Sequence, residues 1–238
     1  MLHGGGASPE HPGDYRLADA ADAKGFVVVY PEGLNRSWND GREISGRTAD
    51  DVGFISALVD EMVHDYNVDP KRVYSTGISN GGYMSFTLAC KLADKIAAVA
   101  PVAGSMSHFT LDACKPAKAV SVLMINGTGD PLVKFEGGPV RGRGDSEPIT
   151  HVVEFWRKQE CGNALVNATQ LPDLDPRDGS TVKVESVACP GREVINYTIE
   201  GGGHTWPGGV QYLPKRMIGP VNRDLDASET IVDFFSHH

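Results

Sequence analysis

The sequence lacks an apolar run of the ~18 residues that a membrane-spanning helix needs, so we expect no transmembrane segment and no membrane partner. None of its cysteines forms a CxxC pair, which argues against a zinc ribbon or a thioredoxin-type redox site. Basic residues are scarce: 22 Lys and Arg stand against 31 Asp and Glu, and a net charge of −9 would repel the phosphates of nucleic acid. Internal repeats and the aspartate spacing of an EF-hand are also missing. We therefore expect neither nucleic acid nor calcium as a ligand.

The four cysteines are even in number, which permits two disulfides. Pairing neighbours along the chain would close two loops, and each bridge would stabilise the fold by about 3 kcal/mol in the chain-entropy model. Four buried free thiols are the alternative. Disulfides would indicate an oxidising compartment, although no signal peptide is visible at the start of this sequence.

The length of 238 residues, with 40% hydrophobic residues, suits a single α/β domain over 1–238. Apolar runs alternate with helix-like segments, which predicts a mostly parallel sheet with helices on both faces. After a strand tail and a glycine loop at 1–6, strands are expected at 25–33, 72–79, 96–104, 119–130 and 192–204. Helices are expected at 14–24, from a cap at 48 or 50 to about 63, at 80–92, at 149–159 and at 226–236. The segments 34–48, 136–148 and 171–180 are expected to be loops. In such sheets, ligands bind at the carboxyl ends of the strands.

One serine stands between two glycines at the end of an expected strand, in Gly77-Ile78-Ser79-Asn80-Gly81. The GxSxG pattern alone is weak, but here it follows a strand and precedes a helix, as a nucleophile elbow requires. The flanking glycines would let strand and helix approach closely while the serine adopts a strained conformation. Ser79 is thus the candidate nucleophile. The alternative is an ordinary strand-to-helix turn with a capping serine.

A serine hydroxyl needs a base, and the base needs an orienting carboxylate. On this type of fold the chain order is serine, acid, histidine. Asp130 follows the expected fourth strand and His204 follows the fifth, so both fit the order and the edge of the sheet. Each taken alone could be a simple loop residue, but together they indicate a Ser-His-Asp triad that needs no metal or cofactor.

The oxyanion of the tetrahedral intermediate needs backbone donors. The elbow itself supplies the N–H of Asn80, and the "HGGG" loop at 3–6 is expected to supply a second. Gly5 is the first choice for that donor and Gly6 the next. A flexible N-terminal tail is the alternative interpretation of the loop.

Together these pieces resemble an esterase family that includes poly(3-hydroxybutyrate) depolymerases and feruloyl and acetylxylan esterases, a branch of the α/β-hydrolases. The matching segments run from residue 2 nearly to the end: "LHGGG", "SWNDG", "DDVGFISALVDEM", "VDPKRVYSTGISNGGYMSF", "IAAVAPVAG", "INGTGDPLV", "FEGG", "GGGHTWPGG" and "DASETIVDFF". The combination of "GISNGG" with "GHTWPGG" is the most specific. The resemblance assigns Ser79 as nucleophile, Asp130 as acid and His204 as base.

The resemblance also implies the disulfides Cys90–Cys114 and Cys161–Cys189, and a secreted or periplasmic location. It places Trp206 beside the site and Trp38 near it as substrate contacts, with core packing as the alternative role for both.

The sequence departs from the family at its start. Members carry a leader and about three strands before "LHGGG", and here almost nothing precedes it. The strand that feeds this loop normally lies between the strands expected at 26–30 and 72–76. Either the chain starts further upstream, or the sheet closes up, or another chain fills the position.

The sequence therefore predicts a serine carboxylic ester hydrolase that works through an acyl-enzyme, on small soluble, aryl or sugar esters of the feruloyl or acetyl type. The segment 136–148 is expected to shape the pocket. A polyester (polyhydroxyalkanoate) depolymerase is the main alternative, and peptidase activity is a more distant one. From a different class, a non-catalytic truncated relative is also considered. A homo-oligomer is possible on this evidence, and the partner is a small or polymeric ester.

Overall fold

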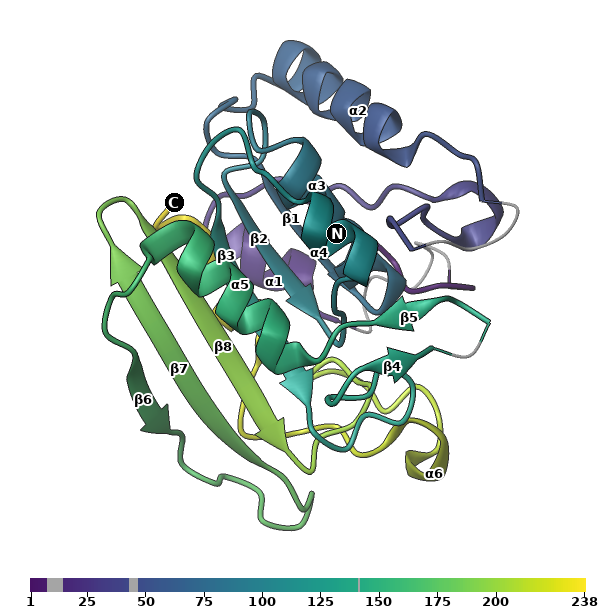
Figure 1. Cartoon of the computed structure of the whole chain (residues 1–238), viewed down its shortest axis with the longest axis vertical. Helices are drawn as coiled ribbons and strands as arrows, with labels where there is room; N and C mark the ends of the chain where they lie inside the picture. Colours follow the sequence, from purple (N-terminus) through teal and green to yellow (C-terminus); the bar gives the residue numbers. More distant parts are fainter. Residues whose placement is uncertain (8–14, 43–46, 141) are drawn as a thin grey trace.

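The computed structural model of the chain describes residues 1–7, 15–42, 47–140 and 142–238. Its main strands are β1 (Tyr74–Ile78), β2 (Ala98–Val102), β3 (Ser121–Gly127), β6 (Asn167–Gln170), β7 (Thr181–Cys189) and β8 (Arg192–Glu200). They form one sheet with the order β1-β2-β3-β8-β7-β6 (Figure 1). β1, β2, β3 and β8 are parallel, whereas β7 pairs antiparallel with both β8 and β6.

Helices cover both faces of this sheet (Figure 1). They are α1 (Leu17–Ala23), α2 (Asp51–Tyr66), α3 (Asn80–Lys91), α4 (His108–Ala113), α5 (Ile149–Cys161), α6 (Lys215–Ile218) and α7 (Ala227–Ser236), with a 3-10 turn at Leu34–Arg36. On one face, α3 and α5 bury Phe86, Leu88 and Trp156 against the sheet. On the other face, α1 and α7 form a second core around Leu17 and Ile231. Within the described residues, none of the helices has the length and apolar character that crossing a membrane requires.

Four of the five expected strands are confirmed as β1, β2, β3 and β8, and they form the parallel part of the sheet. The sequence analysis missed β6 and β7, which extend the sheet beyond β8. β6 is exposed along its whole length, so it carries no apolar signal. β7 alternates apolar and polar residues and pairs with β8 over nine residue pairs, Thr181↔Glu200 to Cys189↔Arg192.

The prediction of a strand at 25–33 is wrong, because this segment forms no strand in the structure. A strand needs a hydrogen-bonding neighbour, and among the described residues only Leu2 pairs with β1 at this edge, in a single parallel bridge to Gly77. The Met1 amino group donates to the Val29 carbonyl at 2.9 Å. The sheet does not close up, and a mostly apolar groove of about 390 Å³ separates residues 26–29 from β1.

Short regular elements lie between the main strands, and one pair of them falls in a segment expected to be a loop. The segment 136–148 contains the antiparallel pair β4 (Gly138–Pro139) and β5 (Asp145–Ser146), which we call the β4–β5 hairpin. The short helix α4 follows β2, and its cap Ser107 accepts the N–H of Thr110 at 3.1 Å. The hairpin lies next to the carboxyl ends of the central strands (Figure 1).

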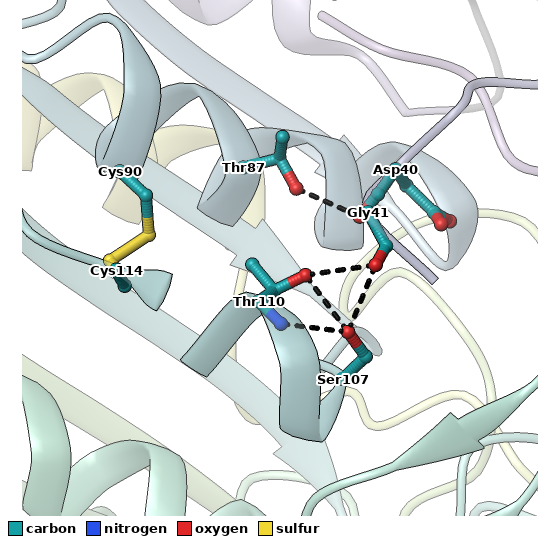
Figure 2. The surroundings of a disulfide bond; sticks show 7 residues. All are labelled: Asp40, Gly41, Thr87, Cys90, Ser107, Thr110 and Cys114. Carbon is teal, nitrogen blue, oxygen red and sulfur yellow. Dashed lines mark hydrogen bonds between the residues drawn. A yellow bond between two sulfur atoms is a disulfide. The ribbon is translucent and has the colours of Figure 1, made fainter. Parts of the chain in front are cut away.

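Both disulfides implied by the resemblance are present, Cys90–Cys114 and Cys161–Cys189. The first joins the last turn of α3 to the end of α4 (Figure 2). Beside this bridge, the Thr87 hydroxyl donates to the Asp40 carbonyl at 2.8 Å. The hydroxyls of Ser107 and Thr110 both donate to the Gly41 carbonyl, at 3.1 and 3.2 Å. The bridge and these bonds therefore fix the segment around 40–41 against α3 and α4.

Replacing Cys90 and Cys114 together with serine is expected to lower the free energy of unfolding by about 3 kcal/mol, because the unfolded chain regains the entropy of the open loop. Urea unfolding of the wild type and the double variant measures this, and the Cys161→Ser/Cys189→Ser pair provides a comparison of similar loop length. An unchanged unfolding midpoint, or four alkylatable thiols in the unreduced denatured protein, would show that the bridges do not form.

Candidate active site

Ser79 occupies the sharp turn between β1 and α3. Its backbone has φ 55° and ψ −119°, a conformation that L-residues rarely adopt and that costs about 1–3 kcal/mol. Hydrogen bonds hold the turn in place: the Ser79 N–H donates to the Val102 carbonyl at 2.9 Å, and the Ser79 carbonyl accepts the Tyr83 N–H at 3.0 Å. The strand, strained turn and helix are the setting that the GxSxG pattern predicted. The side chain is half-buried and caps no helix N–H, so its hydroxyl is left for other chemistry.

The two glycines of the pattern are required by close backbone contacts. A Cβ on Gly77 would lie 2.6 Å from the Leu2 carbonyl oxygen, and one on Gly81 would lie 2.2 Å from the same atom. Real Cβ atoms do not approach backbone oxygen this closely. Gly77 and Gly81 therefore make room for the chain at residue 2, which leads directly into the "HGGG" loop.

Asp130 and His204 form a buried pair. The His204 Nδ1 lies 2.7 Å from Asp130 Oδ2, and the two residues are 3% and 5% exposed. The other carboxylate oxygen accepts the N–H groups of Leu132 and Val133 at 2.7 and 2.8 Å. Because a carboxylate only accepts, the proton of neutral His204 is held on Nδ1, and its Nε2 is left as a hydrogen-bond acceptor.

The loops that carry this pair are themselves joined. The Gly129 N–H donates to the Gly202 carbonyl at 2.9 Å, which brings the loop after β3 against the loop after β8. The Tyr212 hydroxyl donates to the His204 carbonyl at 2.8 Å and steadies the backbone of the histidine. Burial raises the pKa of Tyr212 well above its ordinary value, so this hydroxyl stays protonated and able to donate.

Ser79, Asp130 and His204 follow β1, β3 and β8, so all three stand at the carboxyl edge of the parallel strands. The Asp130–His204 hydrogen bond is formed. Among the hydrogen bonds of the described residues, none joins Ser79 Oγ to His204 Nε2. In enzymes without substrate this bond is often long and tightens only when the substrate binds.

Two backbone amides near Ser79 have no acceptor among the described residues. Asn80 is the first residue of α3, so its N–H has no partner within the helix. The Gly5 N–H also has none, whereas the Gly6 N–H is used by the Arg36 carbonyl at 2.8 Å. A Cβ on Gly4 would lie 3.7 Å from the Ser79 Cβ, so the loop runs past the serine. Gly5 therefore remains the better choice for the second oxyanion donor.

The side chain of Asn80 has a structural role that the sequence analysis did not predict. It is fully buried, and its Oδ1 accepts the Trp38 N–H at 2.8 Å while its Nδ2 donates to the Trp38 carbonyl at 3.1 Å and to Asp40. The Trp38 indole N–H in turn donates to the His3 carbonyl at 3.0 Å. This network links the elbow to the "HGGG" loop. The segment "SWNDG" was noted in the sequence as a family motif. Its hydrogen bonds to Asn80 become visible only in the folded chain.

Comparison with known proteins places the chain in a family. Residues 1–143 match the family model described as esterase PHB depolymerase. The chain belongs to the esterase PHB depolymerase family. The enzyme class predicted from the sequence, a carboxylic ester hydrolase, is the class of this esterase family.

Several curated proteins resemble this family member over most of its length. A protein named putative esterase NocK, from Nocardia uniformis subsp. tsuyamanensis, is 34% identical over 98% of this chain and 72% of its own length. Feruloyl esterase B from Piromyces equi is 34% identical over 84% of this chain. The bifunctional acetylxylan esterase/xylanase XynS20E from Neocallimastix patriciarum is 33% identical over 86% of it. The chain spans only 37% and 28% of the last two proteins.

Solved structures confirm the α/β-hydrolase type of fold for this member of the esterase PHB depolymerase family. The acetyl xylan esterase from Aspergillus awamori superposes with a TM-score of 0.67 at 14% identity, over 100% of this chain and 87% of that chain. The carboxylesterase from Bacillus cereus gives a TM-score of 0.54 at 12% identity, over 98% and 85%. At these identities the likeness concerns the fold alone.

The two tryptophans expected to contact substrate are buried in this esterase-family structure. Trp38 is 0% exposed and Trp206 is 1% exposed. The Trp38 indole braces the "HGGG" loop, and the Trp206 indole N–H donates to the Ser228 hydroxyl at 3.0 Å within the second core. Neither presents a surface that a substrate could touch here. The resemblance implied substrate contacts for both, whereas both indoles pack in the core, the role that was the alternative.

Proposed function

We propose that this protein is a serine esterase that works through an acyl-enzyme, with Ser79 as nucleophile, His204 as base and Asp130 as the orienting acid. The observation that carries the proposal is the buried Asp130–His204 hydrogen bond at the same sheet edge as the strained Ser79 elbow. A buried carboxylate that fixes the histidine tautomer is the arrangement that lets Nε2 accept a proton.

In the proposed reaction, Ser79 Oγ attacks the ester carbonyl carbon while its proton passes to His204 Nε2. The tetrahedral oxyanion accepts hydrogen bonds from the N–H groups of Asn80 and Gly5. The C–O bond to the alcohol then breaks, and His204 returns the proton to the leaving oxygen. Water, deprotonated by the same histidine, attacks the acyl-enzyme and releases the carboxylic acid and free Ser79.

For the substrate we propose small soluble, aryl or sugar esters of the feruloyl or acetyl type, in line with the names of the curated relatives. The family model carries the name of a polyester depolymerase, so polyhydroxybutyrate is the second candidate. We further propose that the protein works in an oxidising compartment, secreted or periplasmic, since both disulfides are formed and such bonds persist there.

A substrate panel tests this proposal: p-nitrophenyl butyrate, methyl ferulate, acetylated xylan and short polyhydroxybutyrate, each with purified protein. We expect hydrolysis of the soluble esters, with slower release of acid from the polyester. A polyester rate above the soluble-ester rates would favour the depolymerase function. No release from any ester above the rate with heat-unfolded protein would reject the esterase and favour a non-catalytic relative.

A further inference from the structure

Arg143 lies in the turn that joins β4 to β5. The β4–β5 hairpin itself lies next to the carboxyl ends of the central strands (Figure 1). The tip is folded on itself: the Val140 N–H donates to the Gly144 carbonyl at 2.8 Å, and the Arg143 N–H donates to the Val140 carbonyl at 2.7 Å. The Val140 side chain is buried. The backbone at Arg143 is therefore held by a hydrogen bond to Val140.

The base of the hairpin is fixed to α3 and to the loop after β2. The Tyr83 hydroxyl, one turn into α3 from Ser79, donates to the Ser146 hydroxyl at 2.7 Å. Burial raises the pKa of Tyr83 to about 12, so the hydroxyl keeps its proton for this bond. The Ser105 hydroxyl donates to the Glu147 carbonyl at 2.8 Å. The hairpin is thus tied to the same helix that the elbow begins.

The Arg143 guanidinium lies directly against the "HGGG" loop. A Cβ placed on Gly5 would be 1.7 Å from Arg143 Nη1 and 2.7 Å from its Cζ, so the guanidinium fills the space that any side chain at residue 5 would need. One residue earlier, a Cβ on Gly4 would be 3.7 Å from the Ser79 Cβ. Gly4 therefore lies beside Ser79, and Arg143 lies beside Gly5. All four residues are partly exposed.

The charge of Arg143 is not neutralised by the described residues. Its guanidinium makes none of their ion pairs or side-chain hydrogen bonds, whereas Arg42 is paired with Asp40. Burial lowers the pKa of Arg47 nearby, and the charges of Arg42 and Arg143 lower it further. Asp40 and Asp51 act in the opposite direction. Among the described residues, the Arg143 guanidinium is therefore left without a carboxylate partner, in a protein whose net charge is −9.

The sheet order indicates which part of an ester lies beside this arginine. The "HGGG" loop continues from Leu2, at the free edge of β1, whereas His204 arrives from β8 on the other side of β1. The base protonates the leaving alcohol, so in the proposed reaction the alcohol lies on the His204 side. The donors at Gly5 and Asn80 then fix the carbonyl oxygen, and the acyl chain takes the remaining direction at that carbon, away from His204.

We propose, resting on the esterase function above, that Arg143 binds a carboxylate on the acyl part of the substrate, so that the enzyme prefers half-esters of dicarboxylic acids. A planar guanidinium offers a fork of N–H donors that fits a carboxylate with two parallel hydrogen bonds. Placed beside the oxyanion donors, that fork fixes the acyl group by its far end while Ser79 attacks the near end.

The test compares monomethyl esters of succinic, glutaric and adipic acid with the corresponding dimethyl esters, which have nearly the same length but no charge. For the wild type we expect kcat/KM for the best half-ester to exceed that for its dimethyl ester. Arg143→Gln is expected to lower kcat/KM for that half-ester by about tenfold to a hundredfold and for the dimethyl ester by no more than about twofold. Arg143→Lys keeps the charge without the fork and is expected to lie between.

Arg72→Gln is the matched control, because Arg72 is an exposed arginine before the opposite, amino end of β1 and should leave both rates unchanged. Hydrolysis of the dimethyl esters also shows that each variant is folded. Equal wild-type rates for charged and neutral esters, or an equal loss on both with Arg143→Gln, would overturn the role of Arg143 while the esterase function stands. No hydrolysis of either series by the wild type would reject both.

Discussion

Ser79→Ala is expected to lower kcat for p-nitrophenyl butyrate by a factor on the order of 10⁴ to 10⁶, because it removes the atom that forms the acyl-enzyme. The residual rate would come from the oxyanion donors and substrate binding alone. Alanine meets the same backbone strain at φ 55° as serine, and the Ser79 hydroxyl caps no helix N–H. The thermal unfolding midpoint should therefore stay close to that of the wild type.

Ser236→Ala is the matched control for this loss. Ser236 is the last residue of α7, and its hydroxyl donates to the Asp233 carbonyl at 2.6 Å, away from the carboxyl edge of the sheet. Initial rates at saturating ester should be unchanged in this variant. If Ser79→Ala and Ser236→Ala were equally active, Ser79 would not be the nucleophile and the elbow would be only a turn.

Asp130→Asn is expected to lower kcat by about 10⁴-fold at neutral pH through the tautomer of His204. The amide oxygen of the variant would keep the N–H donors of Leu132 and Val133, which now hold Asp130 Oδ1. The amide NH₂ would then face His204 Nδ1, which can only accept from it. The histidine proton moves to Nε2, and Nε2 can no longer take the proton of Ser79.

The rate of p-nitrophenol release across a pH series measures this effect. Asp112→Asn serves as the control, because Asp112 is a mostly exposed carboxylate on α4 that pairs with His108. We expect a normal rate in the control and a largely unchanged KM in Asp130→Asn. A kcat within tenfold of the wild type for Asp130→Asn would mean that the carboxylate does not orient the base.

The residues proposed for catalysis were predictable because each carries a local signal at a strand end. Ser79 stands in GxSxG, and Asp130 and His204 follow the expected strands that became β3 and β8. The disulfide pairing came from the resemblance alone, since four cysteines leave several pairings open. The geometry of the elbow agrees with the pattern because Gly77 and Gly81 have backbone neighbours that exclude any side chain.

Features that depend on distant contacts were not predictable. Residues 26–30 are as apolar as a buried strand, but a strand also needs a partner. Within the part of the chain that the structure describes, only Leu2 pairs with β1 at that edge. β6 pairs with β7 while fully exposed, so no hydrophobic pattern marks it. The contact between Arg143 and Gly5 joins residues far apart in the sequence, and the structural role of the Asn80 side chain likewise appears only in the fold.

The central claim is that an ester carbon becomes covalently bound to one serine. Acid quenching of the wild type within milliseconds of mixing with p-nitrophenyl butyrate, followed by proteolysis and mass spectrometry, measures that bond directly. The account predicts one added butyryl group on the peptide containing Ser79, and none on that peptide from Ser79→Ala. Turnover that proceeds with a butyryl group on another residue, or with no acylated peptide at all, would contradict it.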